Sequence, residues 1–169
     1  MENKTIWVMR AGKNSEAQSL FLKSSVIALI DTNMKNLKKI PRNREAFYDA
    51  YKCCDPNNTI TGIKGIGGKY YRFVYELLID DMVLFPSRFD RQVYVGSIKS
   101  DYYYTPKRDK KFPHQRDVQW KLSFDKLGLS EMAKRELGAA RTFFRFKTNI
   151  EEIFTLIDNK IKINRPPFV

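Results

Sequence analysis

Aromatic and basic side chains lie close together in the sequence between Lys99 and Lys121, and their chemistry suits a polyanionic ligand. Tyrosines at positions 102, 103 and 104, together with Trp120, supply flat rings that can stack on a nucleobase. Seven lysines and arginines stand against three aspartates in this stretch, which leaves an excess of four positive charges to attract phosphate. The segment therefore predicts a surface that binds nucleic acid.

Basic side chains elsewhere extend this prediction. Lys39 and Arg42 belong to a stretch rich in cations and free of acids, for which a solvated loop and a phosphate-contacting loop are equally good interpretations. Arg10, next to a turn, could meet a phosphate or form a structural ion pair. The candidate phosphate-binding residues are Arg10, Lys39, Arg42, Arg88, Lys107, Arg108, Lys110, Lys111 and Arg116.

The charge of the whole chain points the same way. A net charge of +12 and a pI near 9.7 favour DNA, RNA or an anionic membrane surface as partner. No apolar run approaches the roughly 18 to 20 residues that span a bilayer, and the N-terminal residues lack the apolar segment of a signal peptide. We therefore expect a cytoplasmic protein. Because aromatic rings accompany the cations, we expect nucleic acid rather than a membrane as its partner.

Residues that could carry catalysis are few. His114 is the only histidine, and the two cysteines, Cys53 and Cys54, are adjacent, so neither a multi-histidine metal site nor paired zinc ligands are expected. The Glu-x-Lys pattern of metal-dependent nucleases occurs at Glu2–Lys4, without a second carboxylate nearby. The sequence predicts a binding module with no cofactor and no catalytic residue of its own.

Hydrophobic periodicity predicts the elements that position these side chains. Short strand patterns occur at 5–9, 26–30, 82–85, 93–98, 118–122 and 142–146, and helical patterns at 15–23, 69–78, 130–137 and 150–163 and after Asn43. The mixture lacks regular alternation of strand and helix. It predicts an α+β fold built on a small, twisted, largely antiparallel β-barrel flanked by helices.

The glycine-rich segment at 62–69 invites a phosphate-loop interpretation, which its spacing contradicts. A Walker loop requires glycine where Ile63 stands and Ser or Thr where Tyr70 stands, and a dinucleotide fingerprint also requires glycine at Tyr70. The segment is interpreted instead as a flexible turn that leads into a helix from about Lys69 to Leu78.

Several motifs in order resemble a known group of domains. They are WVMRAG from Trp7, YYRFVYEL from Tyr70, VLFPS from Val83, VYVGSIKSDYYYTP from Val93, FPHQRDVQW ending at Trp120, and LSEMAKRELGAARTFFRF from Leu129. This succession, over residues 4–147, resembles the PUA-like superfamily with its EVE and YTH domains. It is most similar to the domain found at the N-terminus of modification-dependent restriction endonucleases.

The resemblance implies a β-barrel whose aromatic pocket receives a base that is extruded from DNA or held in a single strand, and tests it for a modification, in the service of a restriction or defence nuclease. Nuclease or motor activity would belong to another domain or a partner. Residues 1–147 would form the base-reading domain, and 148–169 a helix followed by the start of a linker at Arg165–Pro167. The candidate pocket residues are the walls Trp7, Tyr102, Tyr104 and Trp120 and the edge readers Ser87 and Asp101.

Other interpretations remain open at this stage. Trp7 and Trp120 lie inside strand patterns and are equally well explained as core residues. The chain could be an RNA-binding module of the same barrel type, since no sequence feature reports on the 2′-hydroxyl group. It could also be an assembly domain whose C-terminal helix packs on a partner through Ile150, Phe154 and Ile157.

Overall fold

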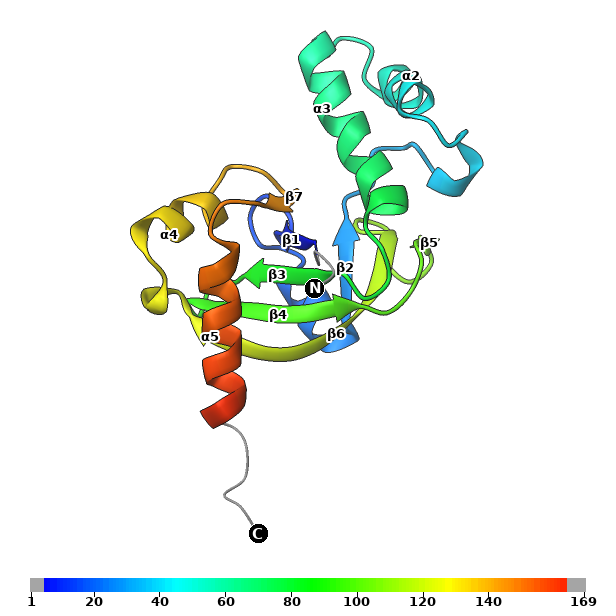
Figure 1. Ribbon diagram of the computed structural model, residues 1–169. Coiled ribbons are helices and arrows are strands. Elements are labelled where there is room, and N and C mark those ends of the chain that lie inside the picture. Colours follow the sequence, from blue (N-terminus) through cyan, green and yellow to red (C-terminus); the bar gives the residue numbers. More distant parts are fainter. Residues whose placement is uncertain (1–4, 164–169) are drawn as a thin grey trace.

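The computed structural model describes residues 5–163, so the features noted at Glu2–Lys4 and Arg165–Pro167 lie outside the described residues. A curled, mixed β-sheet forms its centre (Figure 1). The strands are β1 (Ile6–Met9), β2 (Val26–Leu29), β3 (Met82–Pro86), β4 (Gln92–Ile98), β5 (Tyr103–Tyr104), β6 (His114–Asp125) and β7 (Phe143–Phe146). Their order is β2-β6-β4-β3-β1-β7, with β5 paired to β6.

The helices are distributed around this sheet. They are α1 (Gln18–Ser24), α2 (Arg44–Cys54), α3 (Ile60–Tyr71), α4 (Glu131–Leu137) and α5 (Ile150–Ile163). Two short 3₁₀ helices, η1 (Leu37–Lys39) and η3 (Lys126–Gly128), and one π-helical turn, η2 (Arg72–Glu76), complete the set. In Figure 1, α4 and α5 lie on one side of the sheet, and α2 and α3 project from the opposite end.

The sheet curls because its longest strand serves two sets of neighbours. Residues 114–117 of β6 pair with β2, whereas residues 118–125 pair with β4. The register of the β4–β6 pair shifts between Val95 and Gly96, and such a bulge bends a strand and increases its twist. The result is a half-barrel, which confirms the predicted α+β class and the helix-flanked, barrel-like sheet.

Each face of the sheet carries its own hydrophobic core, because successive residues of a strand point to opposite faces. On β1, Trp7 belongs to the same core as Phe47 of α2, whereas Val8 belongs to the core that contains Ile153 of α5. Both neighbouring side chains are therefore buried. This explains why β1 is a continuous apolar run in the sequence rather than an alternating one.

The prediction of a flexible turn at 62–69 is wrong, because this segment is helical. Helix α3 begins at Ile60, where the Thr59 hydroxyl accepts a hydrogen bond from the N–H of Gly62 over 3.0 Å. Gly67 faces α2, and a Cβ atom there would lie 3.1 Å from the carbonyl oxygen of Phe47 and 3.2 Å from Cα of Tyr48. The glycine thus permits close packing of two helices, a requirement that periodicity does not reveal.

One strand pairing was also not predicted. β1 and β3 run parallel, with Val8 opposite Leu84, while the other five pairings are antiparallel. Seventy-odd residues separate the two strands in the chain, and the helices α1, α2 and α3 occupy that interval. Such a crossover is how parallel neighbours are connected. Within residues 5–163, no helix combines the length and the apolar character that crossing a membrane requires.

Candidate functional site

Two loops meet at one edge of the sheet because β1 and β3 are parallel neighbours. Parallel strands end at the same edge, so the residues that follow Met9 and Pro86 lie together. Arg10 comes directly after β1, and Arg88 comes two residues after β3. The backbone N–H of Arg10 donates to the carbonyl oxygen of Thr142 over 2.8 Å, which holds the first loop against the segment before β7.

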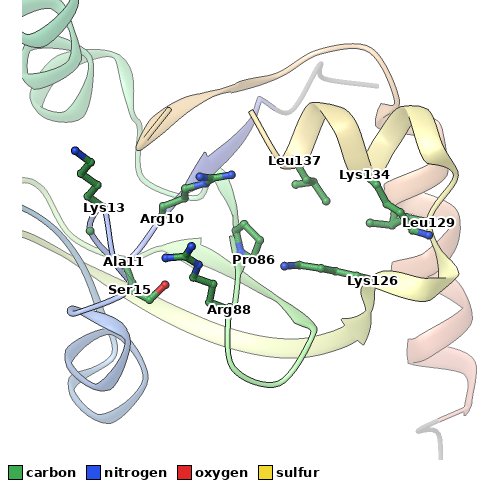
Figure 2. Close-up of a pocket in the computed structure, with 12 residues that line it drawn as sticks. Arg10, Ala11, Lys13, Ser15, Pro86, Arg88, Lys126, Leu129, Lys134 and Leu137 are labelled. Carbon is green, nitrogen blue, oxygen red and sulfur yellow. The ribbon is translucent and has the colours of Figure 1, made fainter. Parts of the chain in front are cut away.

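A cavity of about 280 Å³ opens between these two loops and the η3–α4 segment (Figure 2). This volume is close to the lower end of the range for small-molecule sites, which begins at about 300 Å³. Its apolar walls come from Ala11, Pro86, Leu129 and Leu137, and its cations are Arg10, Lys13, Arg88, Lys126 and Lys134. We call this cavity the basic pocket.

The charge of the basic pocket is one-sided. Among the described residues that line it, five carry a positive charge and none carries a carboxylate. Lys134 pairs with Glu131 at 3.2 Å, but this exposed pair is worth little in water. Several cations around a shared space repel one another, and an anion bound between them relieves that repulsion. The pocket is therefore suited to a phosphate or another anionic group.

Lys126 is the most constrained of these cations. Its ammonium group donates a hydrogen bond to the carbonyl oxygen of Ser87 over 3.0 Å, which ties η3 to the end of β3. Burial, and to a lesser extent the positive charge of Arg10, lowers the pKa of Lys126 below its ordinary value. Figure 2 shows the side chains of Arg10, Arg88 and Lys126 around Pro86.

The loop after β1 depends on Gly12. This residue adopts φ +83°, a left-handed conformation that disfavours side chains, and a Cβ atom on it would lie 2.8 Å from the carboxyl carbon of Glu16. The Glu16 carboxylate accepts a hydrogen bond from the N–H of Asn14 over 2.7 Å. Hydrogen bonds from the backbone, first that of Glu16 itself and then that of Asn14, lower the pKa of this carboxyl group. The loop that carries Arg10 and Lys13 is thus tightly folded.

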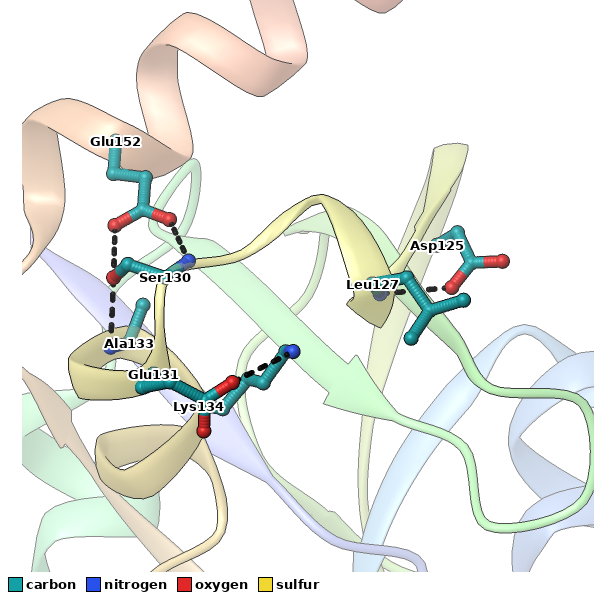
Figure 3. A network of polar contacts seen from close by, with 7 residues as sticks. All are labelled: Asp125, Leu127, Ser130, Glu131, Ala133, Lys134 and Glu152. Atoms are coloured by element: carbon teal, nitrogen blue, oxygen red, sulfur yellow. Dashed lines mark hydrogen bonds and ion pairs between the residues drawn. The ribbon is translucent and has the colours of Figure 1, made fainter.

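The opposite wall of the pocket is fixed by helix caps (Figure 3). Asp125 accepts from the N–H of Leu127 over 2.9 Å at the start of η3. Ser130 caps α4 by accepting from the N–H of Ala133 over 3.2 Å, and its own hydroxyl donates to Glu152 of α5 over 2.7 Å. These contacts determine where Lys126, Leu129 and Lys134 stand.

A second cavity, of about 600 Å³, is lined in part by the segment that joins α4 to β7. Its arginines are partly neutralised, because Glu76 contacts Arg44 at 2.5 Å and Arg145 at 3.4 Å. Burial and the nearby charge of Arg44 lower the pKa of Arg72. Since it is more open and contains carboxylates, this cavity is a weaker anion site than the basic pocket.

The expectation that Trp7 forms the wall of a base pocket is wrong. Trp7 is fully buried, stacks on Phe143 with ring centroids 4.7 Å apart, and donates from Nε1 to Asp81 over 2.9 Å. Arg145 covers the indole from the outside, with its guanidinium carbon 4.8 Å from the ring centroid. Trp7 is therefore a core residue, the alternative that its place inside a strand pattern left open.

Tyr102 and Tyr104 enclose a histidine rather than an empty space. Both rings stack on His114, with centroid distances of 5.8 Å and 5.3 Å. The Tyr102 hydroxyl lies 2.7 Å from Nδ1 of His114 and accepts from the N–H of Leu37 over 3.1 Å. Burial lowers the pKa of His114 to about 4, so this ring is neutral at pH 7. Because His114 fills the space, these tyrosines form no base pocket.

The remaining pocket candidates are also placed elsewhere. Trp120 is half-buried, packs against Phe85 and donates from Nε1 to the carbonyl oxygen of Phe21 over 2.8 Å. Ser87 is fully buried and its hydroxyl donates to Gln18 over 3.1 Å, so it cannot contact the edge of a base. Asp101 is exposed, in the connection from β4 to β5. Our assignment of an aromatic base pocket is thus contradicted for the rings and for Ser87.

Arg116 is not a phosphate-binding residue. It is 1% exposed, and its guanidinium donates to the carbonyl oxygens of Ser100 and Phe73, each over 3.0 Å, and to that of Leu77. Burial lowers its pKa to about 10, which leaves it charged at pH 7. Arg116 therefore stabilises the end of the π-helical turn, and this role corrects its assignment to the phosphate-binding set.

The other phosphate candidates fall into two groups. Arg10 and Arg88 line the basic pocket. The rest are exposed and do not line it: Lys39 ends η1, Lys111 pairs loosely with Glu16 at 3.8 Å, and Arg42 lies over the ring of Tyr75. This second group comprises Lys39, Arg42, Lys107, Arg108, Lys110 and Lys111.

Sequence reasoning missed Lys13, Lys126 and Lys134. Lys13 directly follows the Arg10-Ala11-Gly12 turn, and that adjacency could have indicated it. Lys126 and Lys134 reach the pocket only through the fold, since they follow β6 and lie in α4. Across the described part of the chain, His, Cys, Asp and Glu side chains form no group suited to hold a metal ion.

By its fold and its site, the protein is a half-barrel flanked by helices, with a cationic pocket at one edge of the sheet. The chain belongs to a family described as a domain of unknown function (DUF8426), whose model matches residues 7–147. No curated protein matches the sequence. Among solved structures, a hypothetical protein from Leishmania major aligns with a TM-score of 0.46 at 10% identity, covering 95% of this chain and 98% of that chain.

Proposed function

We propose that this protein is a nucleic-acid-binding specificity module that holds one nucleotide of its ligand in the basic pocket. The observation that carries the proposal is the lining of that pocket, which combines five cations with apolar walls and, in the described chain, contains no carboxylate. Cations attract the phosphate, and apolar surface accepts the flat face of a base. The net charge of +12 supports a polyanionic ligand.

The finer proposal is that the ligand is DNA and that the bound base carries a modification. It rests on the resemblance of the ordered motifs to modified-base readers. Extruding a base from a duplex costs a few kcal/mol, which contacts in the pocket and to the flanking phosphates must offset. A buried methyl group contributes only about 0.8 kcal/mol, so discrimination requires a close fit against Pro86, Leu129 and Leu137.

In this proposal the chain recognises the modified base and does not cleave the DNA. Cleavage or motor activity, if the module serves a restriction or defence system, comes from another domain or a partner protein. The module then contributes specificity, because it brings the active component to sites that carry the modified base.

The test is binding of labelled oligonucleotides at two salt concentrations. Matched single- and double-stranded DNA, and RNA of the same sequence, should carry cytosine, 5-methylcytosine or N6-methyladenine at one position. We expect affinity to fall steeply with salt, and Arg10→Ala and Arg88→Ala each to flatten the salt slope by about 1. Lys64→Ala is the matched control, since Lys64 is an exposed lysine on α3, far from α4 in Figure 1.

Three outcomes are informative. A preference of the wild type for one modified base, together with a flatter salt slope in Arg10→Ala, supports the complete proposal. Steep salt dependence without base preference supports a general nucleic-acid binder, and stronger binding to RNA moves the ligand class to RNA. Equal effects of Arg10→Ala and Lys64→Ala, or an absence of binding, contradict the assignment of the basic pocket.

A further inference from the structure

A large exposed apolar side chain directly follows a residue that lines the basic pocket. Phe89 lies in the connection between β3 and β4 and is 73% exposed, although its chain neighbour Arg88 lines the pocket. Its ring takes part in no aromatic pair among the described residues, so the fold makes no evident use of it. In proteins that bind nucleic acid, an exposed aromatic ring can stack on a base or wedge between bases.

The backbone that carries Phe89 is held on both sides. Across the connection, the N–H of Ser87 donates to the carbonyl oxygen of Gln92 over 2.8 Å. The N–H of Phe89 donates to the buried hydroxyl of Ser87 over 3.2 Å, and the N–H of Gln92 donates to the Asp90 carboxylate over 3.0 Å. Tyr94 also donates to Asp90, over 2.5 Å. These hydrogen bonds fix the backbone of the β3–β4 connection, and we call the part that carries Phe89 its tip.

The segment after β6 adds a second brace. Lys126 donates from its ammonium group to the carbonyl oxygen of Ser87 and from its backbone N–H to that of Arg91, each over 3.0 Å. Arg91 adopts φ 57°, which turns the chain sharply after the tip. A residue on such a support loses little conformational freedom when it binds.

Cations flank the exposed ring. Arg88 and Arg91 stand on either side of Phe89 in the chain, and the Asp90 carboxylate between them is engaged by Tyr94 and the backbone. The β3–β4 connection thus carries an exposed apolar ring with an arginine on each side in the chain, and Arg88 is one of the five cations that line the basic pocket. Proteins that distort duplex DNA insert apolar wedges of this kind while cations hold the phosphates on either side.

We propose that Phe89 is a wedge that enters a base-pair step of a duplex and occupies the gap left when the neighbouring nucleotide moves into the basic pocket. This inference rests on the proposed function and adds the state of the ligand, namely a duplex that is opened at one step. Aromatic stacking on the exposed base replaces the stacking lost on extrusion. The ring reads no sequence, because every base offers a π-face.

A short DNA duplex with one 2-aminopurine next to a single mismatch is the probe, because the fluorescence of 2-aminopurine rises when it unstacks. We expect the wild-type protein to raise the fluorescence on binding. Phe89→Ala should abolish the rise and weaken duplex binding about 5- to 150-fold. Phe89→Leu should retain part of the signal, because leucine also serves as a wedge.

The controls separate this inference from the function on which it rests. Ile60→Ala removes an equally exposed apolar side chain, 75% accessible, from the start of α3, and should behave as wild type. Arg88→Ala should reduce the salt slope while leaving the ring in place. Phe89 is exposed, so its substitution should leave the thermal unfolding curve unchanged.

Each result decides between defined alternatives. If the wild type binds and Phe89→Ala equals it in affinity and fluorescence, the wedge is wrong and the proposed function stands. If Phe89→Ala loses affinity without any fluorescence rise in the wild type, Phe89 is an ordinary contact and the wedge is again wrong. If the wild type binds no duplex, the wedge proposal is contradicted. Binding of the single strand then decides whether the proposed function is contradicted as well.

Discussion

The guanidinium group of Arg116 donates a hydrogen bond over 3.0 Å to the backbone carbonyl oxygen of Phe73, 43 positions earlier in the chain. Phe73 belongs to the π-helical turn that ends α3, where carbonyl groups lack partners within the helix. Arg116, at the start of β6, supplies the donors for that end. The contact joins the helical hairpin of α2 and α3 to the sheet.

We therefore predict that Arg116→Ala lowers the free energy of unfolding by about 2 to 4 kcal/mol, because buried carbonyl groups lose their donors. Urea denaturation followed by circular dichroism measures the change. Arg88→Ala, at an exposed position, should stay within about 0.5 kcal/mol of wild type. A stable Arg116→Ala variant that fails to bind nucleic acid would restore Arg116 to the phosphate-binding set.

Tyr102→Phe should destabilise the protein without changing base preference. The hydroxyl connects the N–H of Leu37 to Nδ1 of His114, and its loss leaves buried polar groups unpaired, at a cost of about 1 to 3 kcal/mol. Thermal unfolding and oligonucleotide binding should be measured on the same preparation. Loss of preference for a modified base with unchanged stability would revive an aromatic pocket at this position.

Two glycines of one helix should respond to alanine in opposite directions. Gly65→Ala should stabilise the protein by about 0.5 to 1 kcal/mol, since a Cβ atom there meets nothing within 4 Å and alanine is the better helix former. Gly67→Ala should destabilise it, because the added methyl group would press on the backbone of α2, 3.1 Å from the Phe47 oxygen. Equal denaturation midpoints for the two variants would contradict the close helix packing.

His114 predicts how stability depends on pH. Its pKa in the folded protein, about 4, lies below the ordinary 6.5, so between these values the unfolded chain binds the extra proton. The free energy of unfolding should therefore fall as pH drops from about 6.5 to 4, by about 3 kcal/mol at most from this residue. His114→Gln, which cannot titrate, should lose less stability than wild type between pH 7 and pH 4.5 in urea titrations.

The exposed basic loop after β5 provides a test of general phosphate contact. Lys110→Ala should weaken binding to every sequence by a similar factor and flatten the salt slope, because a phosphate contact carries no base information. Salt titrations against two unrelated sequences measure this. An unchanged slope would favour the alternative that the loop at 107–111 is simply solvated.

Local patterns predicted most elements because they report on burial within one segment. The apolar run before Arg10 predicted β1, and Ser130 predicted the start of α4, where it caps the helix. Patterns failed where two distant segments decide the outcome. In the sequence, a glycine such as Gly67 is equally compatible with a flexible turn and with close helix packing. Only the proximity of Tyr48 in the structure shows that close packing is its role.

The site was harder to predict for the same reason. Arg10 and Arg88 were included as candidates, but the parallel pairing of β1 with β3, which brings them together, leaves no trace in either strand. We assigned Trp7 and Tyr102 to a base pocket although both are buried in the core, because an aromatic residue looks the same in the sequence whether it lines a pocket or fills a core. Only the filling of the space by Phe143 and His114 settles which one it is.

The basic pocket draws its lining from chain segments near residues 10–15, 86–88 and 126–138. In the unfolded chain these segments are far apart, so the affinity for any ligand of the pocket exists only in the native state. Occupancy and folding are then thermodynamically linked, and a ligand present at a hundred times its dissociation constant adds about 2.7 kcal/mol to the unfolding free energy. Melting temperature thus becomes a direct readout for screening nucleotides against this protein.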